Sequence, residues 1–202
     1  MSEIKSQLLF DEEAHVYTLH RDGMADIVLP SVTEIMKPLS QQAYGGISER
    51  ILDTAADRGT RVHRAVEFYL KYHFKNVDED CTGYFDGIMQ FLNQHKDWKP
   101  LHSEYRFYHK SLMYAGTCDL LFDTPQGITL VDLKSTAQAH KGMWGVQLAG
   151  YKAGLESYCP TLKISATKVL QAFKDGTYTL HEVKQGFPTF LACLQIKNFK
   201  ED

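Results

Sequence analysis

The chain has 202 residues, of which 44% are hydrophobic and 12% aromatic, enough apolar material for one sizeable core. Its formal charge of −3 does not indicate the strongly basic composition of many nucleic-acid-binding proteins, so any contact with DNA must use a local patch. No run approaches the roughly 18 apolar residues of a membrane span, and an apolar leader is lacking at the N-terminus. We therefore expect one soluble domain, cytoplasmic and without membrane contact.

The cysteines are scattered along the chain, at Cys81, Cys118, Cys159 and Cys193. Because no CxxC or similar close pair occurs, neither a zinc ribbon nor a disulfide framework is predicted. An iron–sulfur cluster is not expected either, since its ligands include closely spaced cysteines. Reduced thiols are the expected state.

The sequence pattern over residues 1–45 predicts a β extension followed by a short helix. A turn at 21–23 lies among the extended runs, which predicts a small meander or hairpin. Ser31, Val32, Thr33 and Glu34 have capping-box spacing, so a helix should begin there and end at Pro38. The extended runs cover residues 8–10, 15–19 and 27–29.

The rest of the chain alternates helical and strand-like patterns. Helical spacing runs from 48 to 74 with Gly59 as a candidate break, so one helix and two fit equally well. Short turns between the next three strands predict an antiparallel meander, and the order helix, three strands, helix, strand predicts an α/β sandwich around a mixed sheet. The remaining predictions are a helix at 84–92, strands at 101–109, 112–122 and 127–134, a helix at 143–158, strands at 164–173 and 177–183, and a helix at 188–199.

Asp132 and Lys134 are two residues apart on a predicted strand, so their side chains point to the same face. Asp119 lies near the end of the preceding apolar run. Carboxylates converging from neighbouring strands are hard ligands for Mg²⁺ or Mn²⁺, and a lysine beside them could stabilise a phosphate or orient water. D-x-K alone is common on solvated strands, so this pattern needs further support.

Two helices supply candidate partners for these acids. His63 could complete a carboxylate-rich metal site, and Glu67, one turn later, could hold its second nitrogen or lie near the metal in the outer shell. Gln147 and Tyr151 are spaced i, i+4 and could reach the same cleft. Taken singly, each of these residues is more often a packing or surface residue.

Basic and aromatic side chains gather near both helices and could form the local DNA-binding patch. Charges on helices more often form a solvated face and aromatic residues at helical spacing are more often core, although Trp144 could stack on unpaired bases. The candidate DNA-binding residues are Arg58, Arg61, Arg64, Lys141, Trp144 and Lys152.

In order and spacing, the motifs resemble the PD-(D/E)xK nuclease superfamily, in particular its RecB-like exonuclease branch. They are Gly59-Thr60-x-x-His63, Glu104, Gly116-Thr117-Cys118-Asp119, Asp132-Leu133-Lys134 and Gln147-x-x-x-Tyr151. The stretch 29–33 is similar to the opening of phage-type and mitochondrial genome maintenance exonucleases of that branch. The resemblance implies a restriction-endonuclease-like core (αβββαβ) over 48–183, with an N-terminal β-hairpin extension over 1–45 and a C-terminal helix over 187–202.

The resemblance also implies the roles of the site residues. Lys134 would be the catalytic lysine, Gln147 and Tyr151 would assist substrate binding and phosphate positioning, and Glu104 would be a further metal ligand. The iron–sulfur cluster of some relatives is not carried over, because the grouped cysteines are lacking. The implied ligands of Mg²⁺ or Mn²⁺ are His63, Asp119, Asp132 and the backbone carbonyl of Leu133.

We therefore expect a divalent-metal-dependent DNA exonuclease of phage or prophage origin, acting on DNA ends in processing, recombination or repair. It would act alone or with a separate recombination or annealing protein. A structure-dependent endonuclease and a Cas4-like end trimmer remain alternatives on the same site. A non-catalytic DNA- or protein-binding module is the alternative of another class. Cleavage polarity, strand preference, the number of metal ions and the oligomeric state stay open.

Overall fold

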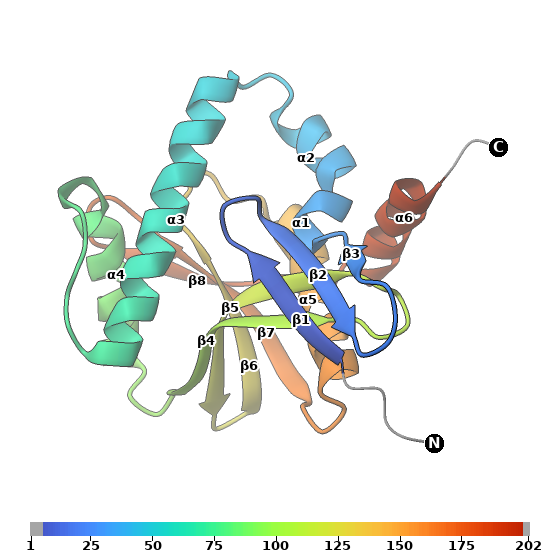
Figure 1. The fold of residues 1–202 in the computed structure, drawn as a ribbon. Helices are drawn as coiled ribbons and strands as arrows, with labels where there is room; N and C mark the ends of the chain where they lie inside the picture. Colours follow the sequence, from blue (N-terminus) through green and yellow to red (C-terminus); the bar gives the residue numbers. More distant parts are fainter. Residues whose placement is uncertain (1–5, 200–202) are drawn as a thin grey trace.

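The computed structural model describes residues 6–199 (Figure 1). The predicted extension and C-terminal helix each include a few terminal residues, 1–5 and 200–202, that lie outside this described part. Within it, the strands form a three-stranded antiparallel sheet and a five-stranded mixed sheet that is flanked by helices. The predicted mixed α/β class is confirmed.

The elements follow the predicted order closely. The strands are β1 Ser6–Asp11, β2 Val16–Arg21, β3 Ile27–Leu29, β4 Lys99–Tyr108, β5 Ala115–Thr124, β6 Gly127–Lys134, β7 Ile164–Ala172 and β8 Tyr178–Glu182. The helices are α1 Val32–Ile35, α2 Lys37–Tyr44, α3 Glu49–Tyr72, α4 Thr82–Gln94, α5 Lys141–Tyr158 and α6 Phe187–Asn198, with a 3₁₀ turn η1 at Glu79–Cys81.

The large sheet has the order β4-β5-β6-β7-β8. The meander β4-β5-β6 is antiparallel, as its short turns predict, whereas β6 and β7 are parallel and joined by α5. Such a crossover needs a connection long enough to bring the chain back to the end of the sheet at which β6 began, which a helix provides. The sequence therefore places α5 directly after the strand that carries Asp132 and Lys134.

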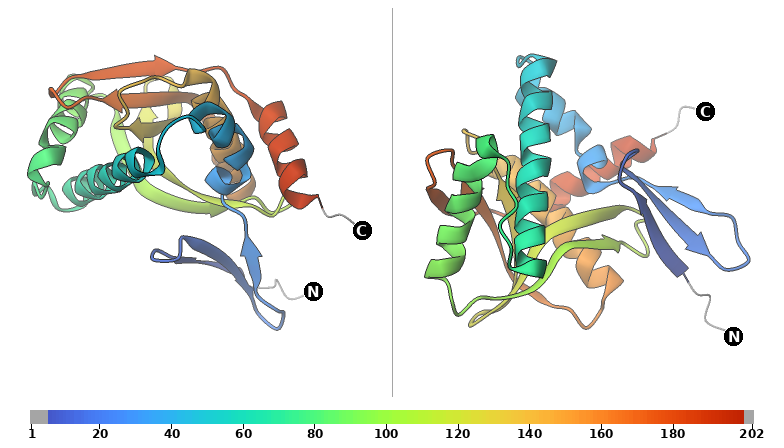
Figure 2. Two further views of the ribbon diagram at one scale, coloured as in Figure 1. Left: turned by 90° about the horizontal axis from the view of Figure 1, so that it is seen from above. Right: turned by 60° about the vertical axis from the view of Figure 1, so that its left-hand side comes forward.

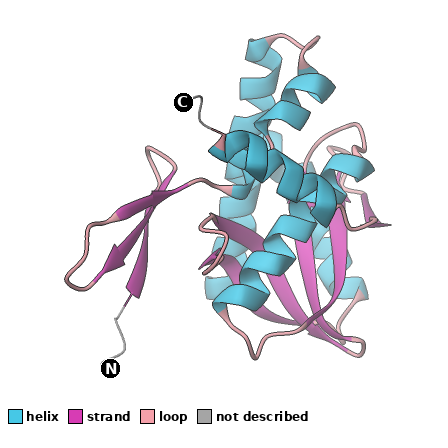
Figure 3. Cartoon of the chain, turned by 90° about the vertical axis from the view of Figure 1, so that its right-hand side faces the viewer, coloured by secondary structure: helices cyan, strands magenta, loops and turns pink. Residues whose placement is uncertain are grey.

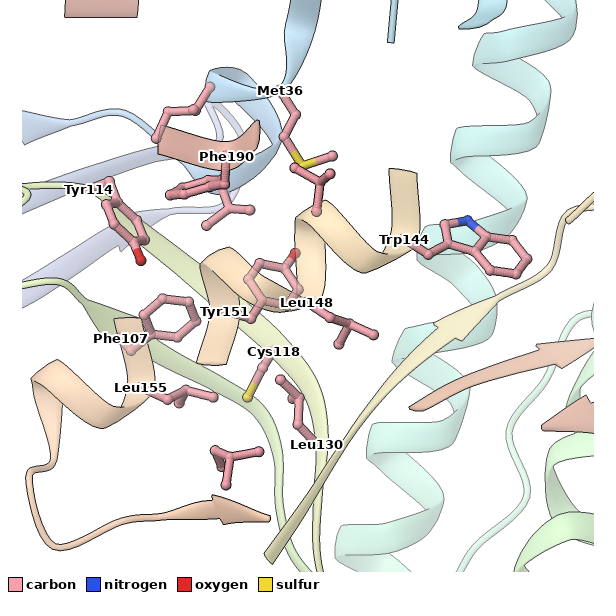
Figure 4. Close-up of a cluster of buried hydrophobic side chains, with 14 of the residues drawn as sticks. Met36, Phe107, Tyr114, Cys118, Leu130, Trp144, Leu148, Tyr151, Leu155 and Phe190 are labelled. Carbon is pink, nitrogen blue, oxygen red and sulfur yellow. The ribbon is translucent and has the colours of Figure 1, made fainter. Parts of the chain in front are cut away.

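Helices cover both faces of the large sheet. On one face α3 and α4 pack a cluster that includes Val66, Phe85 and Phe91. On the other face α1, α5 and α6 enclose the cluster drawn in Figure 4, where Tyr114 packs on Phe190 and Tyr151 on Phe107. The second face explains why α5 is apolar on most sides: it is buried between the sheet and α6.

The three-stranded sheet stands beside this body and is joined to it through β3 and α1 (Figures 2 and 3). Its inner side chains, Tyr17, Leu19 and Leu29, pack on Tyr108 and Ala115 of the large sheet. The Tyr17 hydroxyl also shares a hydrogen bond of 2.7 Å with Thr117 Oγ1. The small sheet is therefore fixed against the end of β5 at which the site residues lie.

Two predicted helix boundaries differ from the structure. Ser31 Oγ caps α1 as its spacing predicts, accepting the Glu34 N–H at 3.0 Å. Pro38, however, occupies the first turn of α2 rather than ending a helix, because a first-turn proline loses no intrahelical hydrogen bond. Gly59 lies inside a continuous α3, so the two-helix alternative is wrong. No helix within residues 6–199 is long and apolar enough to cross a membrane.

Candidate metal and catalytic site

The site lies where β5 and β6 separate. Their ladder ends at the pair Leu120 and Val131, whereas the other edge of β6 stays paired with β7 as far as Lys134. Beyond the last pair, Asp119 Oδ2 accepts a hydrogen bond of 2.6 Å from the Leu133 N–H. A side-chain carboxylate thus replaces the missing strand partner, which satisfies a backbone donor that would otherwise be buried without one.

His63 reaches this gap from α3. Its Nε2–H donates to the Leu133 carbonyl at 3.2 Å, because a carbonyl can only accept. Its Nδ1 lies 3.5 Å from Glu104 Oε1 and 3.5 Å from Asp119 Oδ1. Ligand atoms of His63, Glu104 and Asp119 all lie within 4.8 Å of one another, a grouping that could hold a metal ion.

Glu104 enters the site from β4 with a left-handed backbone, φ 49°. This conformation is uncommon for a residue other than glycine and costs energy that the surrounding structure must supply. The β4–β5 register also shifts by one residue between Pro100 and His102. The left-handed residue is thus itself a member of the carboxylate cluster, and such strain is often found at functional sites.

Asp132 and Lys134 share a face, as their spacing predicts. Lys134 Nζ forms a buried ion pair with Asp132 Oδ2 at 2.7 Å. Lys134 also donates to Gln147 Oε1 at 3.1 Å, and Gln147 Nε2 donates to the Tyr151 hydroxyl at 2.8 Å. The two α5 residues therefore fix the lysine head.

The buried carboxyl groups of the site shift one another's pKa values and that of His63. Burial raises the pKa of Asp132 to about 6, against the attraction of Lys134, and raises the pKa of Asp119 as well. Burial would lower the pKa of His63, but the carboxylates of Asp119 and Glu104 outweigh it and raise that pKa to about 9. At neutral pH His63 is thus protonated and acts as a counter-ion.

The donor set fits Mg²⁺ or Mn²⁺. Carboxylate oxygens with one imidazole are hard to borderline ligands of the kind these ions accept. Asp119 and Asp132 are almost fully buried, and Lys134 Nζ, 2.7 Å from Asp132 Oδ2, is a cation that already faces this acid. His63, Glu104 and Asp119 have ligand atoms close enough together to hold the ion, whereas Asp132, a predicted ligand, lies outside that group and faces Lys134. The Leu133 carbonyl, a predicted ligand, is already engaged by His63 and keeps one lone pair.

These residues form the floor of a cleft of about 660 Å³. Asp132 is 1% exposed and Asp119 is 7% exposed, so a reacting phosphate must enter the recess to meet them. Gln147 and Tyr151 also line the cleft, and their contact with a substrate stays a prediction. Glu67 lines it too. It does not hold the second nitrogen of His63, because the Leu133 carbonyl takes that role, and its place in the outer shell of a metal stays a prediction.

The predicted DNA-binding residues do not form one patch. Arg64 is exposed and lines the cleft. Arg61 instead forms ion pairs with Asp57, Asp78 and Asp80, which raise its pKa and lower that of Asp80 to about 2. Its charge is therefore compensated within the protein.

The other predicted contacts also lie away from the cleft. Arg58 stacks on Tyr84 and donates to the Ser135 carbonyl at 3.0 Å, so it holds the chain after Lys134. Trp144 is 3% exposed and packs in the core beside His181, and its prediction as a base-stacking residue is wrong. Lys141 and Lys152 lie on α5, where Lys141 is exposed, and neither is among the described lining residues.

Gln171 is a site residue that the sequence does not reveal. It lies on β7 opposite Lys134, is 2% exposed, and donates to the Thr136 carbonyl at 2.7 Å. Its Oε1 accepts from His181 Nε2 at 2.8 Å. Together with Arg58 it fixes the two carbonyls that follow the lysine. No local pattern marks it, since its role depends on the β6–β7 register.

Comparison with protein-family models finds no match for this chain, and comparison with curated proteins also finds none. The fold and the site together define a mixed α/β protein with a recessed cluster of acidic residues, one histidine and one lysine.

Proposed function

We propose that the protein is a divalent-metal-dependent DNA exonuclease of the PD-(D/E)xK superfamily, with a restriction-endonuclease-like core. The observation that carries the proposal is the gathering of His63, Glu104, Asp119, Asp132 and Lys134 at the open end of the β5–β6 pair. These residues come from α3, β4, β5 and β6, so the fold itself assembles the cluster.

Each residue has a chemical task in phosphodiester hydrolysis. Mg²⁺ or Mn²⁺, when bound, supplies charge neutralisation and lowers the pKa of a bound water. Lys134, held between Asp132 and Gln147, presents a fixed ammonium to the charge that develops on the phosphate. Tyr151 holds Gln147, which keeps the lysine head in place without reorganisation during the reaction.

The depth of the site favours action at an end. Because Asp119 and Asp132 lie at the floor of the cleft, a strand end can enter the recess more easily than the middle of a continuous duplex. This supports an exonuclease over a structure-dependent endonuclease on the same residues.

Incubation of the protein with labelled DNA tests the proposal. The substrates are linear single- and double-stranded DNA labelled at the 5′ or 3′ end, beside a closed circle, with Mg²⁺ or Mn²⁺. We expect cleavage of linear DNA that disappears with EDTA and in Lys134→Ala, with the released label giving the polarity. Circle cutting would replace the exonuclease by an endonuclease. A folded protein that cleaves none of these substrates would be a non-catalytic binding module.

A further inference from the structure

The wall of the cleft that faces the small sheet carries a cation, Arg106 of β4. Arg106 pairs in register with Thr117 of β5, so the two side chains lie on the same face of the sheet. Asp119 follows on that face two residues after Thr117, roughly 7 Å along the strand, and all three residues line the cleft. Arg106 therefore lies beside the carboxylate cluster.

Aromatic contacts orient the Arg106 guanidinium. Its Cζ lies 4.8 Å from the centroid of the Phe10 ring, and Phe10 packs against Tyr17 with ring centroids 4.4 Å apart. Tyr17 is in turn hydrogen-bonded to Thr117. A guanidinium that stacks on a ring keeps its N–H donors in its own plane, where they can bind an anion.

Glu12 takes only part of this donor capacity. Arg106 Nη2 donates to Glu12 Oε1 at 2.9 Å. An arginine has five N–H donors, and no other hydrogen bond of this guanidinium occurs within residues 6–199. Glu104, two residues earlier on β4, faces His63 instead. Glu12 is therefore the counter-ion of Arg106 in the free protein.

The ion pair is exposed enough for a substrate to open it. The side chains of Arg106 and Glu12 are 43% and 70% exposed, and such pairs contribute little because water and salt screen them. A phosphate can accept from a guanidinium through two oxygens at once. A strand held at the metal site would present its neighbouring phosphate to Arg106 at a high effective concentration. Phosphate would therefore displace the Glu12 carboxylate.

The charge of the β1–β2 turn gives this exchange a consequence for binding. Asp11, Glu12 and Glu13 follow one another there. While Glu12 holds Arg106, the turn presents only negative charge to an incoming phosphate, which it repels. Opening the pair turns this side of the cleft from a repulsive surface into a phosphate contact.

We propose that Arg106 binds a phosphate of the substrate and that Glu12 blocks it in the free protein, as an autoinhibitory contact that the substrate opens. This inference rests on the proposed function, because the phosphate belongs to the strand held at the metal site. It adds a phosphate-binding residue and gives the β1–β2 turn a role in controlling the site. The competing explanation is that the pair only ties the turn to β4.

A double-mutant cycle on DNA binding tests the inference. The variants are Glu12→Gln, Arg106→Gln and the two combined. The control is Glu13→Gln, which removes the same charge from an exposed neighbour that is not among the cleft-lining residues described. The probe is a fluorescein-labelled duplex with a single-stranded overhang, so the result does not depend on strand preference. Fluorescence anisotropy in Ca²⁺, without detectable cleavage, gives the affinity at several salt concentrations.

We expect Glu12→Gln to bind about two- to fivefold more tightly than the wild type, the range that an exposed ion pair allows. Glu13→Gln should change the affinity less. Arg106→Gln should weaken binding and reduce the salt slope by about 1, and adding Glu12→Gln to it should bring no gain. Thermal melting shows whether Arg106→Gln is folded; if it is not, the comparison of Glu12→Gln with Glu13→Gln decides.

A gain in Glu12→Gln that persists without Arg106, or that Glu13→Gln matches, would be general repulsion and would overturn the inference. A Glu12→Gln variant that melts earlier and binds no better would leave the pair as a structural tie and overturn it too. Failure of the proposed function gives a different result, namely no Mn²⁺-dependent cleavage by the wild type. A wild type that binds the probe as the cycle predicts without cleaving it would keep the exchange and lose the nuclease.

Discussion

The carboxylate of Asp119 and the backbone of Leu133 are joined across the gap between β5 and β6. Because Oδ2 accepts the Leu133 N–H at 2.6 Å, the other oxygen, Oδ1, is left facing His63 at 3.5 Å. One side chain therefore closes the broken ladder and supplies a candidate metal ligand. The separation of β5 from β6 therefore opens the recess and also places the Asp119 carboxylate in it.

Asp119→Asn should lower the pKa of His63. The amide oxygen can still accept the Leu133 N–H, so the fold is expected to persist, but the negative charge that helps raise the His63 pKa to about 9 is lost. An NMR titration of the His63 ring in metal-free protein measures the change. Glu67→Gln is the matched control, because Glu67 is a cleft carboxylate on the same helix. A His63 pKa near 9 in Asp119→Asn would contradict this electrostatic account.

Mn²⁺ affinity should rise with pH between about 6 and 9. Metal ligands must be deprotonated, and the pKa values of Asp132 and His63 are raised to about 6 and about 9. Binding at pH 7 should therefore release a proton from His63. Calorimetric titrations in buffers of different ionisation enthalpy count the protons. A binding enthalpy that does not depend on the buffer would be inconsistent with a protonated His63.

Metal-free protein should lose stability as the pH rises. The folded-state pKa values of His63 and Asp132 lie above their ordinary values of 6.5 and 3.8, so each group binds its proton more tightly in the folded state. Their contributions are complete below the ordinary pKa and are lost as the pH passes through about 6 for Asp132 and about 9 for His63. Thermal melts in EDTA from pH 6.5 to 9.5 should show a fall that is smaller in His63→Gln. A melting temperature that rises over this range in the wild type, but not in the variant, would reverse the assigned sign.

Arg61 and Arg64 should differ in their effect on DNA binding although both are arginines of α3. Arg64 lines the cleft, so Arg64→Gln should weaken binding and reduce the salt slope by about 1. Arg61 is engaged by three aspartates, so Arg61→Gln should leave both nearly unchanged. Titrations at several salt concentrations compare them. Equal losses in the two variants would restore the predicted arginine patch.

Trp144→Ala should reduce stability rather than act as the loss of a DNA contact. Removing an indole that is 3% exposed leaves a cavity in the core, with a cost of about 3–5 kcal/mol. Urea unfolding measures this cost, and Trp144→Phe is the milder control. Unchanged stability together with weaker binding of single-stranded DNA would show that the indole contacts the substrate.

The sequence predicts those parts of the site that depend on local periodicity. Asp132 and Lys134 share a face because a strand repeats every two residues, and Gln147 and Tyr151 share one because they are four apart on a helix. Short turns also fix the antiparallel order of β4, β5 and β6.

Features that depend on tertiary register are not predictable in this way. Gln171 holds the Thr136 carbonyl only because β7 pairs in parallel with β6. Arg61 is withdrawn from the DNA patch by Asp78 and Asp80, which lie beyond the end of its helix. The left-handed backbone of Glu104 has no sequence signal, because the residue is not a glycine.

Parallel titrations of Mn²⁺ binding and of Mn²⁺-dependent cleavage of a labelled single strand, in wild type and Asp119→Asn, test the central claim most directly. The account predicts that binding and cleavage in the wild type share one midpoint, and that the variant, still folded, loses both. The claim would be contradicted if Asp119→Asn cleaved DNA at the wild-type rate, or if its affinity for Mn²⁺ were unchanged.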